Sequence, residues 1–460
     1  MRNSVGGGMF FLLLILSLSS CRPDEELVST SPNLRLQIST DTVLFDTLLS
    51  ERGSITRRFR IYNPNKAAVK FDEIRLGKGN NSDYSLIING KESNRIRNET
   101  LFGKDSLQVL VSVFIDPQDQ NLPYLVKDSV VFDWNGNSGH VKLVAYGQDA
   151  IYINADTLCN VTWTADRPYV IYNYALVDTL CTLNIDPGAR VFLDNDAAIL
   201  VKGSLKLNGE FDNRITVRNS RFDAAYEVAP GQWDAIYLLE GSTDNEVHYS
   251  DLTNGTIGLR VGTPDDDDDF DLIITNSTIG HMSSSGILAF TSEIYASNTV
   301  VYNCRDYLVG NFAGGTYQYD HCTLSNFPNL FSRDEPSVQF SDNIVVGGGS
   351  VISAPLNITL RNTIIWGSER EELLIVESAG EPVARNFLTG ILRSDIPYNN
   401  FIISQEQNFP GFLNPQLFDY HLDSLSFSID KGTEIGISSD LDGNIRVPKP
   451  DLGAYEYIKE

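Results

Sequence analysis

A run of five consecutive aspartates has the composition of a cation site. Asp265, Asp267 and Asp269 stand at alternate positions within it. Hard cations such as Ca²⁺ take six to eight oxygen ligands in proteins, and carboxylates are common donors. Five adjacent carboxylates cannot all face one ion, however, and runs of like charge are commonly solvated. The sequence therefore predicts an acidic loop in water, with a calcium site as the alternative.

A second oxygen-rich group lies near the C-terminus. Asp440, Asp442, Asn444 and Asp451 occupy the relative positions 1, 3, 5 and 12 of a calcium-binding loop. Gly443 falls at position 4, although such a loop needs its glycine at position 6. Because Asp-Gly is above all a turn signal, the sequence favours a capping turn, with a cation site again as the alternative.

Side chains that act as nucleophiles, bases or zinc ligands do not form a recognised set in the sequence. The five histidines lack metal-ligand spacing, and the chain contains neither a Gly-x-Ser-x-Gly elbow nor a phosphate loop. Arg260 and Arg361 are expected at outward strand positions, where an arginine can act as a base or contact a sugar but is more often a surface charge. The sequence therefore assigns no catalytic residue.

The composition indicates a folded, acidic, all-β chain. Hydrophobic residues make up 42% of the 460 residues, which is enough for a core, and the length allows two or three domains. The chain has 35 lysines and arginines against 60 aspartates and glutamates, a net charge of −25, so nucleic acid is excluded as a partner. Frequent Gly, Asn, Asp and Ser clusters indicate short strands joined by turns.

Residues 1–20 have the pattern of a secretory leader. Arg2 precedes an apolar run from Met9 to Leu18, which is too short for a bilayer span of about 20 residues. The run ends in Leu-Ser-Ser-Cys, which resembles the bacterial lipobox and implies that Cys21 becomes the lipidated first residue of the mature chain. An ordinary leader with an incidental cysteine is the alternative.

Residues 21–33 are predicted to form a tether, because they have no apolar period and contain several Ser, Thr and Pro residues. Asp24, Glu25 and Glu26 stand just behind Cys21. An acidic cluster at this place resembles the surface-export signal of Bacteroidota lipoproteins, with a solvated linker as the alternative. The resemblance implies a protein that is anchored in the outer membrane and faces the outside of the cell.

Residues 34–149 are predicted to form a β-sandwich. Apolar and polar residues alternate in several short segments, which are separated by turn sequences. About seven strands in a unit of this size are typical of a sandwich. The segments 59–63, 115–117 and 143–147 resemble the immunoglobulin-like modules of the ASH and major-sperm-protein type. That resemblance implies a spacer or a protein-binding module without catalytic residues.

The rest of the chain repeats a short strand pattern. The two residues at two and four positions before each repeat anchor are apolar, and the residue immediately before it is polar. The anchors are Asn219, Asp251, Asn276, Asn298, His321, Asp342 and Asn362. A strand that recurs every 20 to 25 residues and ends in a residue that tolerates a left-handed turn indicates a parallel β-solenoid, whereas a propeller needs blades of about 40 residues.

Two further strands are expected in each coil. The segments 258–261, 286–289 and 307–309 mark the second strand. The third strand is marked by Ile279, Val301, Leu324, Val345 and Ile365. Three strands per coil favour the right-handed triangular form of the β-helix.

Two cysteines are spaced by one coil. Cys159 and Cys181 share the preceding sequence Asp-Thr-Leu and lie 22 residues apart. Stacked coils are separated by roughly 4.8 Å, which falls within the Cα–Cα window of a disulfide. An exported protein can form that bond, but two free buried cysteines fit the stack equally well, and the state of Cys304 and Cys322 is also open.

The ends of the repeat carry more specific sequences. The N-terminal part contains Trp163 and the segments 185–188 and 230–233, and the C-terminal part contains the segments 418–422 and 451–457. These resemble the opening coils and the C-terminal cap of secreted right-handed parallel β-helix proteins of Bacteroidota, with a pectate lyase-like fold, over residues 150–457. The fold that this resemblance implies is shared by lyases, glycosidases and proteins without activity, so it does not select a function.

These observations predict a lipid-anchored, monomeric surface protein in which a β-sandwich presents a β-helix that binds a glycan or a protein without cleaving it. The alternative is a polysaccharide lyase or glycoside hydrolase of the same fold class. The outward positions beside the anchors include one acid, Asp320, whereas a glycosidase needs two nearby carboxylates. Converging carboxylates would favour the enzyme, and an aromatic face would favour binding. No cofactor is predicted beyond the two candidate calcium sites.

Overall fold

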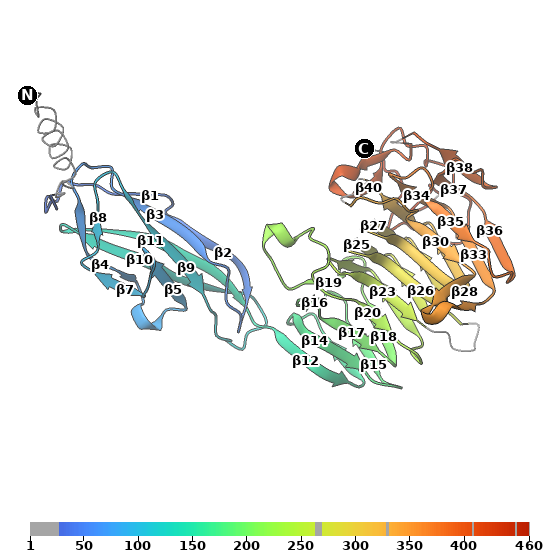
Figure 1. The fold of residues 1–460 in the computed structure, drawn as a ribbon, viewed down its shortest axis with the longest axis horizontal. Helices are drawn as coiled ribbons and strands as arrows, with labels where there is room; N and C mark the ends of the chain where they lie inside the picture. The colour runs from blue at the N-terminus through green and yellow to red at the C-terminus, as the bar shows by residue number, and fades with distance from the viewer. Residues whose placement is uncertain (1–26, 263–268, 328–330, 407–408, 447–448, 460) are drawn as a thin grey trace, which may run out of the picture. The chain divides into compact units, whose positions relative to one another are not determined.

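A computed structural model of the chain describes residues 27–262, 269–327, 331–406, 409–446 and 449–459 (Figure 1). The chain divides into two compact units, residues 1–148 and 149–460. The predicted lipidation site Cys21 and the acidic residues behind it lie outside the described residues. Within the described ranges, no helix has both the length and the apolar character needed to cross a membrane.

The first unit consists of two β-sheets that enclose one core. One sheet contains, in spatial order, β1 (Gln37–Ile38), β3 (Arg57–Tyr62), β9 (Ser106–Val113), β5 (Tyr84–Ile88) and β6 (Lys91–Glu92). The other contains β2 (Thr42–Leu49), β11 (Asn137–Gln148), β10 (Tyr124–Trp134), β4 (Val69–Leu76) and β7 (Arg95–Arg97), with β8 (Thr100–Leu101) beside β4. A short 3₁₀ helix, η1 (Gly79–Asn81), follows β4. Strict alternation in β9 buries every second residue, as expected for a sandwich.

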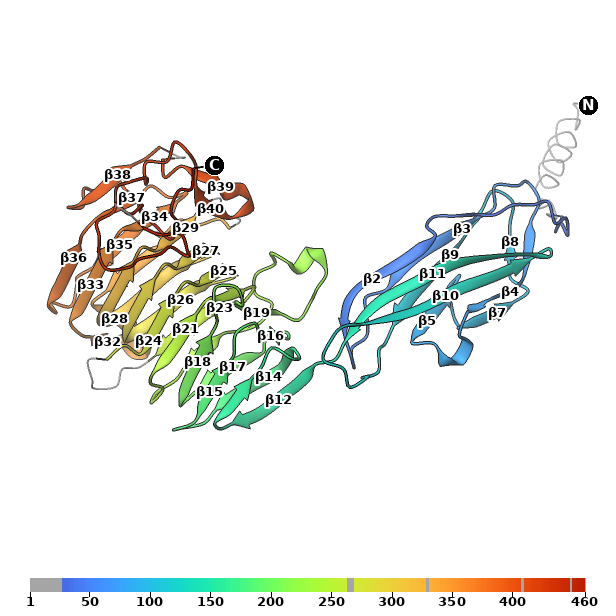
Figure 2. The same cartoon turned by 180° about the vertical axis from the view of Figure 1, so that it is seen from behind.

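The second unit is a right-handed parallel β-helix of three-stranded coils, so the all-β fold predicted from the sequence is confirmed (Figures 1 and 2). We name its three sheets faces A, B and C. Face A contains β16 (Arg190–Leu193), β19 (Ile215–Asn219), β22 (Ser250–Thr253), β25 (Thr278–Met282), β27 (Val300–Cys304), β29 (Thr323–Asn326), β34 (Thr363–Gly367), β37 (Gly390–Arg393) and β38 (Phe401–Ser404).

Faces B and C complete the coils. Face B contains β17 (Ala198–Val201), β20 (Ile236–Leu238), β23 (Ile257–Gly262), β30 (Val338–Ser341) and β35 (Leu373–Val376). Face C contains β13 (Val161–Trp163), β15 (Thr182–Ile185), β18 (Ser204–Asn208), β21 (Asn245–His248), β24 (Leu272–Thr275), β33 (Leu356–Arg361) and β36 (Val383–Phe387). Four long strands turn a corner: β12 (Ile151–Leu158) and β14 (Tyr169–Val177) join faces A and B, and β26 (Ser285–Ser297) and β28 (Tyr307–Asp320) join faces B and C.

The remaining elements lie outside the three faces. They are the hairpins β31 (Asn343–Val346) with β32 (Ser350–Ser353) and β39 (Phe412–Asn414) with β40 (Asp419–Leu422), and the 3₁₀ helices η2 (Ala224–Tyr226), η3 (Gly347–Gly349) and η4 (Pro415–Leu417).

Register stacking places the apolar residues of the repeat above one another inside the coils. Ile274 and Leu360 belong to one row on face C, and Phe340 stacks on face B between Asn311 and Ile375. The side chains of Ile274, Phe340 and Leu360 are fully buried in one cluster. The prediction that these three residues point into a continuous core is therefore confirmed.

One residue of each successive coil turns the corner after face C in the left-handed region of backbone conformation. These residues form a column along the β-helix. Tyr249, Asn276, Asn298, His321 and Asn362 have φ between 41° and 54°. Within the column, Asn298 donates a hydrogen bond to Asn276 at 3.0 Å, and Asn362 bonds to His321 at 2.8 Å. Amide and imidazole side chains thus link the coils where the backbone turns.

Three of the predicted anchors do not belong to this column. Asn219 ends β19 and Asp251 lies inside β22, both on face A, and Asp342 follows β30 on face B. Tyr249 lies two positions before the predicted anchor Asp251 and was therefore expected in the core. It is instead a half-buried corner residue. The error has a physical cause: all three faces alternate apolar and polar residues, so periodicity alone does not tell one corner from another.

Val345 also departs from the expected third strand. It lies in the hairpin of β31 and β32, and its exposed fraction is 65%. Residues 343–353 leave the coil and return. Ile365 therefore stacks directly on Leu324, without the strand that was predicted at Val345 between them. Because of this insertion, the sequence spacing of Leu324, Val345 and Ile365 resembles successive coils, although Val345 adds no strand to the core.

The C-terminal segment, of which residues 409–446 and 449–457 are described, packs against the outer side of face A. Phe412, Tyr420 and Leu452 share an apolar cluster with Ile364 and Trp366 of β34. The end of the helical core has its own cover, because Tyr398 and Phe401 pack around the ring of Phe387. The sequence-predicted cap therefore lies along the side of the coils.

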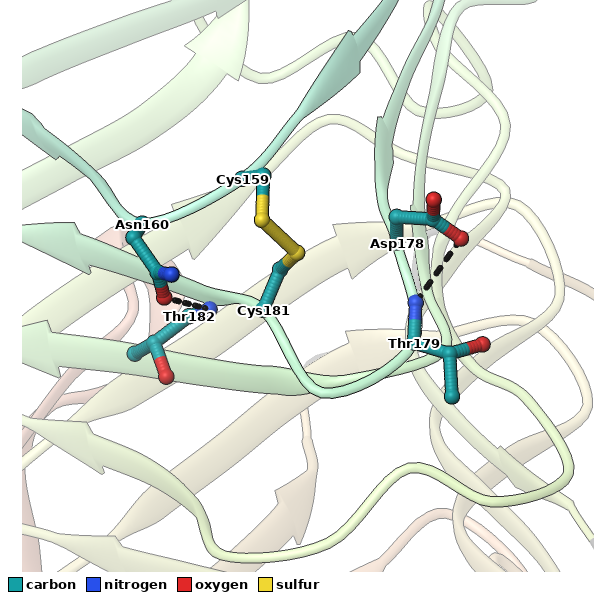
Figure 3. Close-up of a disulfide and its surroundings, with 6 residues drawn as sticks. All are labelled: Cys159, Asn160, Asp178, Thr179, Cys181 and Thr182. Carbon is teal, nitrogen blue, oxygen red and sulfur yellow. Dashed lines mark hydrogen bonds between the residues drawn. A yellow bond between two sulfur atoms is a disulfide. The ribbon is translucent and has the colours of Figure 1, made fainter.

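A disulfide joins Cys159 and Cys181 in the first coils, with their Cα atoms 4.6 Å apart (Figure 3). The Asn160 side chain accepts a hydrogen bond from the Thr182 backbone at 3.1 Å beside it. Cys304 and Cys322 are free and buried, and burial raises the pKa of each thiol to about 12. These two thiols are therefore protonated and shielded at neutral pH.

Phe340→Ala should lower the free energy of unfolding of the β-helix by about 3–5 kcal/mol, because the substitution leaves a large cavity in a closed core. The Phe340 ring packs 5.8 Å from the ring of Tyr317 and 6.2 Å from that of Tyr319. Guanidinium unfolding followed by circular dichroism measures the change. Leu425→Ala, at a side chain with 85% exposure, is the matched control and should change stability by less than about 0.5 kcal/mol. Equal effects of the two substitutions would show that the register is wrong.

Candidate ligand-binding face

Face B presents a row of large side chains to the outside on successive coils. Leu200, Tyr237, Arg260 and Leu288 stack directly above one another. The rings of Phe290 and Phe312 form a second row, two residues further along the strands. All six side chains are half-buried, whereas the residues between them point into the core. Alternation in β20, β23, β26 and β28 therefore creates this outward row.

Two aromatic rings of the row stack on each other, and a cation lies over two of the rings. The guanidinium carbon of Arg260 lies 5.7 Å from the centre of the Tyr237 ring and 5.2 Å from that of Phe290. Phe290 and Phe312 stack with centroids 5.9 Å apart, and Tyr307 meets Phe312 edge-on at 5.6 Å. We call Tyr237, Arg260, Phe290, Tyr307 and Phe312 the face B ladder. It combines four aromatic rings with one positive charge, which lies between Tyr237 and Phe290.

Gly310 lies beneath the upper part of the ladder. A side chain at this position would come within 3.0 Å of the Phe312 ring and 3.1 Å of the Tyr307 ring. Both rings therefore lean over the backbone of β28, which a larger residue would prevent.

Of two polar groups of the ladder, those of Tyr237 and Arg260, the first has a hydrogen-bond partner within the protein, and the second has none among the described residues. The Tyr237 hydroxyl donates a hydrogen bond to Asp234 at 2.9 Å, and burial raises the pKa of Tyr237 to about 12, so the phenol is neutral. Arg260 has neither an ion pair nor a hydrogen bond from its guanidinium to any residue that the structure describes. Its N–H groups can therefore serve a ligand that stacks on the adjacent rings.

Face C carries paired charges on its outer side. Glu246 binds Lys206 at 2.7 Å and His248 at 2.9 Å, and the Lys206 hydrogen bond lowers the pKa of Glu246. Arg361 binds Asp320 at 2.7 Å, and that bond raises the pKa of Arg361. Arg361, for which the sequence favoured a surface charge over a base or a sugar contact, therefore neutralises a carboxylate and cannot take up a proton.

Glu246 and Asp320 are too far apart to act together. Glu246 lies on β21 and Asp320 on β28, with β24 and β26 between them. Three strand steps correspond to about 14 Å, whereas the carboxyl groups of an inverting glycosidase lie roughly 6.5–9.5 Å apart and those of a retaining one about 5 Å. Face C therefore lacks the geometry of a glycosidase pair at these two residues.

Two carboxylates on neighbouring coils lie at the corner before face C. Asp271 and Glu293 precede β24 and the face C part of β26, and the Asp271 carboxylate accepts the backbone N–H of Glu293 at 2.9 Å. This pair was not predicted from the sequence, because only the outward positions next to the repeat anchors were considered. Asp271 and Glu293 lie at the opposite end of the strands. The contact fixes the turn into β26, which gives Asp271 a structural role.

The C-terminal oxygen-rich group is a turn in which each side chain has its own partner. Asp440 is fully buried, and its carboxylate accepts the backbone N–H groups of Asp442, Asn444 and Glu456 at 2.7–2.9 Å. The Asp442 carboxylate binds His421 at 2.6 Å instead. The Asn444 side chain donates a hydrogen bond to the Asp440 carboxylate at 3.1 Å, so these polar groups are satisfied within the turn and by His421.

The aspartate run lies largely beyond the described chain. Asp265 and Asp267 are outside the described residues, and Asp269 is the first residue after the gap. Where the structure describes side chains, no group of three or more His, Cys, Asp or Glu residues is placed to hold a metal ion.

A cavity of about 300 Å³ lies beside the C-terminal segment, between Phe327 and the hairpin of β39 and β40. Its lining residues are Phe327, Pro410, Gly411, Phe412, Pro415, Gln416 and Asp423. Asp423 is the carboxylate among them, and it accepts the backbone N–H of Leu425 at 2.7 Å. The cavity therefore does not supply an acid–base pair.

No family model matches the chain, and no curated protein matches its sequence. Several solved structures resemble parts of it, among them the following three. The catalytic unit of the thermostable GH87 alpha-1,3-glucanase from Streptomyces thermodiastaticus is 10% identical, with a TM-score of 0.26, over 75% of this chain and 75% of that chain. An ASH/PapD-like domain of human CEP192 is 13% identical, with a TM-score of 0.17, over 28% of this chain and 94% of that chain.

The third structure is the Vibrio cholerae VesB protease, which is 16% identical with a TM-score of 0.18. The match covers 24% of this chain and 31% of that chain, so it spans well under two thirds of that protein. At these identities and TM-scores the three likenesses say nothing about activity. The description of the chain as an immunoglobulin-like sandwich and a parallel β-helix follows from its own strand pairing.

His421 clamps the C-terminal segment through two carboxylates. Its ring nitrogens lie 2.5 Å from Asp419 and 2.6 Å from Asp442, and its ring packs on Tyr455 with centroids 4.0 Å apart. The Asp442 hydrogen bond, followed by that of Asp419, raises the pKa of His421 to about 9. The imidazolium is therefore charged at neutral pH and joins the hairpin of β39 and β40 to the turn at 440–444.

His421→Gln should lower the free energy of unfolding at pH 6, and the difference from the unsubstituted chain should disappear by pH 10. The folded-state pKa lies above the ordinary value near 6.5, so the clamp stabilises fully below about pH 6.5 and is lost as pH rises through 9. Guanidinium unfolding from pH 6 to pH 10 measures this difference. His140→Gln, at an exposed histidine, is the control. A His421→Gln effect that does not vary with pH would contradict the clamp.

Proposed function

We propose that the chain is a lipid-anchored cell-surface protein whose β-helix binds a glycan on face B without cleaving it. The observation that carries the proposal is the face B ladder. Sugar rings have faces made of C–H groups, which pack on aromatic side chains, and they have hydroxyl groups, which need donors and acceptors. Tyr237, Phe290 and Phe312 supply the rings, and Arg260 supplies N–H groups at the same surface.

The ion pairs of face C support binding over cleavage. A glycosidase needs one carboxyl group with a raised pKa as general acid and a second one nearby. Glu246 is held ionised by Lys206 and His248, and Asp320 is bound by Arg361. Asp451 and Glu456, whose pKa values are raised by burial, lie in the C-terminal segment among the bonds of Arg446. A lyase or hydrolase remains the alternative that the experiment must test.

The disulfide supports an extracytoplasmic location. Disulfide bonds form and persist in oxidising compartments and are rare in the cytosol. The Cys159–Cys181 bond joins the first coils, so an oxidising compartment would stabilise the start of the β-helix. Together with the lipobox-like sequence before Cys21, this favours a protein that is exported and then anchored.

Phe290→Ala and Phe312→Ala should each weaken glycan binding about tenfold, because each removes a ring from the centre of the binding surface. A panel of immobilised polysaccharides identifies the ligand, and calorimetry with its oligosaccharide measures the affinity. Tyr295→Ala is the matched control, since Tyr295 is a half-buried outward ring on face C. Equal losses in all three variants would contradict a site on face B.

The same samples test for cleavage. The proposal expects neither new reducing ends nor unsaturated products that absorb in the ultraviolet, with or without Ca²⁺. Either product, lost in a variant of Asp271 or Glu293 but kept in the ladder variants, would replace the binding proposal by the enzyme alternative.

Cys21→Ala should move the protein from the membrane fraction to the soluble fraction, because the acyl chains that the lipobox implies need this thiol. Fractionation and immunoblotting of cells that express each form measure the change. Cys322→Ser, at a buried free cysteine, serves as a control for the loss of any thiol. Full membrane retention of Cys21→Ala would contradict lipid anchoring at this residue.

A further inference from the structure

The two units of the chain carry opposite net charge. Residues 27–148 contain 15 lysines and arginines and 13 aspartates and glutamates, a net charge of +2. Residues 149–460 contain 18 lysines and arginines and 44 aspartates and glutamates, a net charge of −26. The acidity of the whole chain therefore belongs to the β-helix. Such asymmetry between two parts of a chain is typical of a protein with one part at a charged surface.

Two exposed arginines lie on the outer side of one sheet of the sandwich. Arg58, Arg60 and Tyr62 of β3 point outward and are exposed. Beside them, Leu110 of β9 stacks between Arg58 and Ile87. We call Arg58, Arg60, Tyr62, Ile87 and Leu110 the β3 face. The described strands of this sheet contain one carboxylate, Glu92, which lies on the edge strand β6.

Arg58 and Arg60 lack the carboxylate partners that Lys91, Arg95 and Arg97 have. Arg95 and Arg97 share Glu73, whose pKa they lower to about 2, and Lys91 binds Glu99 at 2.7 Å. The side chains of Arg58 and Arg60 have neither an ion pair nor a hydrogen bond to any residue within the described ranges. Their charge is therefore available to an anionic partner.

We propose that the β3 face docks on the headgroup surface of an anionic lipid bilayer. This inference rests on the proposed lipid anchor. Leu27 is the sixth residue after Cys21, so the anchor would hold the start of the sandwich within about 20 Å of the bilayer. The chain then enters the sheet at β1, the strand paired with β3. A tyrosine and two aliphatic side chains beside two arginines match an interface with phosphate groups and acyl chains.

The two units respond in opposite ways to an anionic bilayer, so only the sandwich is expected to bind to it. A net charge of −26 is repelled by the same anionic surface, whereas the β3 face is attracted to it within about one Debye length of 8 Å. A basic residue near such a surface strengthens binding about fivefold. Loss of Arg58 and Arg60 should therefore weaken binding about 25-fold.

Cosedimentation with lipid vesicles tests the inference. The protein is residues 22–460, which contain every described residue of both units and lack the leader and the Cys21 thiol. Vesicles of phosphatidylcholine with 30% phosphatidylglycerol should bind it, and pure phosphatidylcholine vesicles should not. Raising NaCl from 0.05 to 0.3 M should weaken the binding, because salt screens exposed charges.

The double variant Arg58→Gln/Arg60→Gln should lose about 25-fold in vesicle binding. The matched control is Arg370→Gln/Arg385→Gln, which removes two arginines that are paired with Asp395 and Glu377 in the β-helix. This control should bind vesicles as the unsubstituted chain does. Circular dichroism melting shows that each variant is folded.

Equal binding to both kinds of vesicle, or equal effects of the two double variants, would overturn the inference. Self-association in sedimentation velocity that Arg58→Gln/Arg60→Gln abolishes, without vesicle binding, would overturn it in favour of a second copy of the chain. Glycan binding should survive in Arg58→Gln/Arg60→Gln, and vesicle binding should survive in Phe290→Ala. Failure of the docking surface and failure of the glycan site are thus distinguishable.

Discussion

In-register stacking of parallel coils is the constraint on which the β-helix depends. Each residue lies directly above its counterpart in the preceding coil, so a side-chain type that recurs in the sequence becomes a row in space. The column from Asn276 to Asn362 shows the effect at a corner, where side-chain hydrogen bonds join neighbouring turns. Arg446 of the C-terminal segment binds Asn298 of the same column at 2.9 Å, which fixes that segment to the coils. Register thus determines both the core and what surrounds it.

The three faces differ because stacking repeats different chemistry on each. The outer side of face A is covered by the C-terminal segment, for example by the ring of Tyr420, which packs on Tyr302. Face C stacks charges that neutralise one another, as Arg361 and Asp320 do. Face B stacks rings around Arg260, whose guanidinium has no polar partner among the described residues. Because the guanidinium of Arg260 lies beside aromatic rings and is not paired with a described carboxylate, face B is the proposed glycan site.

The sequence predicted the architecture because apolar periodicity carries it, and it predicted the core positions of Ile274, Phe340 and Leu360 for the same reason. Periodicity did not separate the faces, so Asn219 and Asp342 were placed at the wrong corner, and it did not reveal the excursion that exposes Val345. The face B ladder was missed although Arg260 was singled out. Its rings come from coils up to 75 residues apart, between positions 237 and 312, and the outward positions of the second strand were the signal that could have found them.

A crystal structure of the chain with the oligosaccharide that it binds most tightly is the most direct test of the central claim. The account predicts sugar rings stacked on Tyr237, Phe290 and Phe312, with a polar group of the ligand on the guanidinium of Arg260. An oligosaccharide bound along face C between Glu246 and Asp320, or at the corner formed by Asp271 and Glu293, would contradict a binding site built by the aromatic stack of face B.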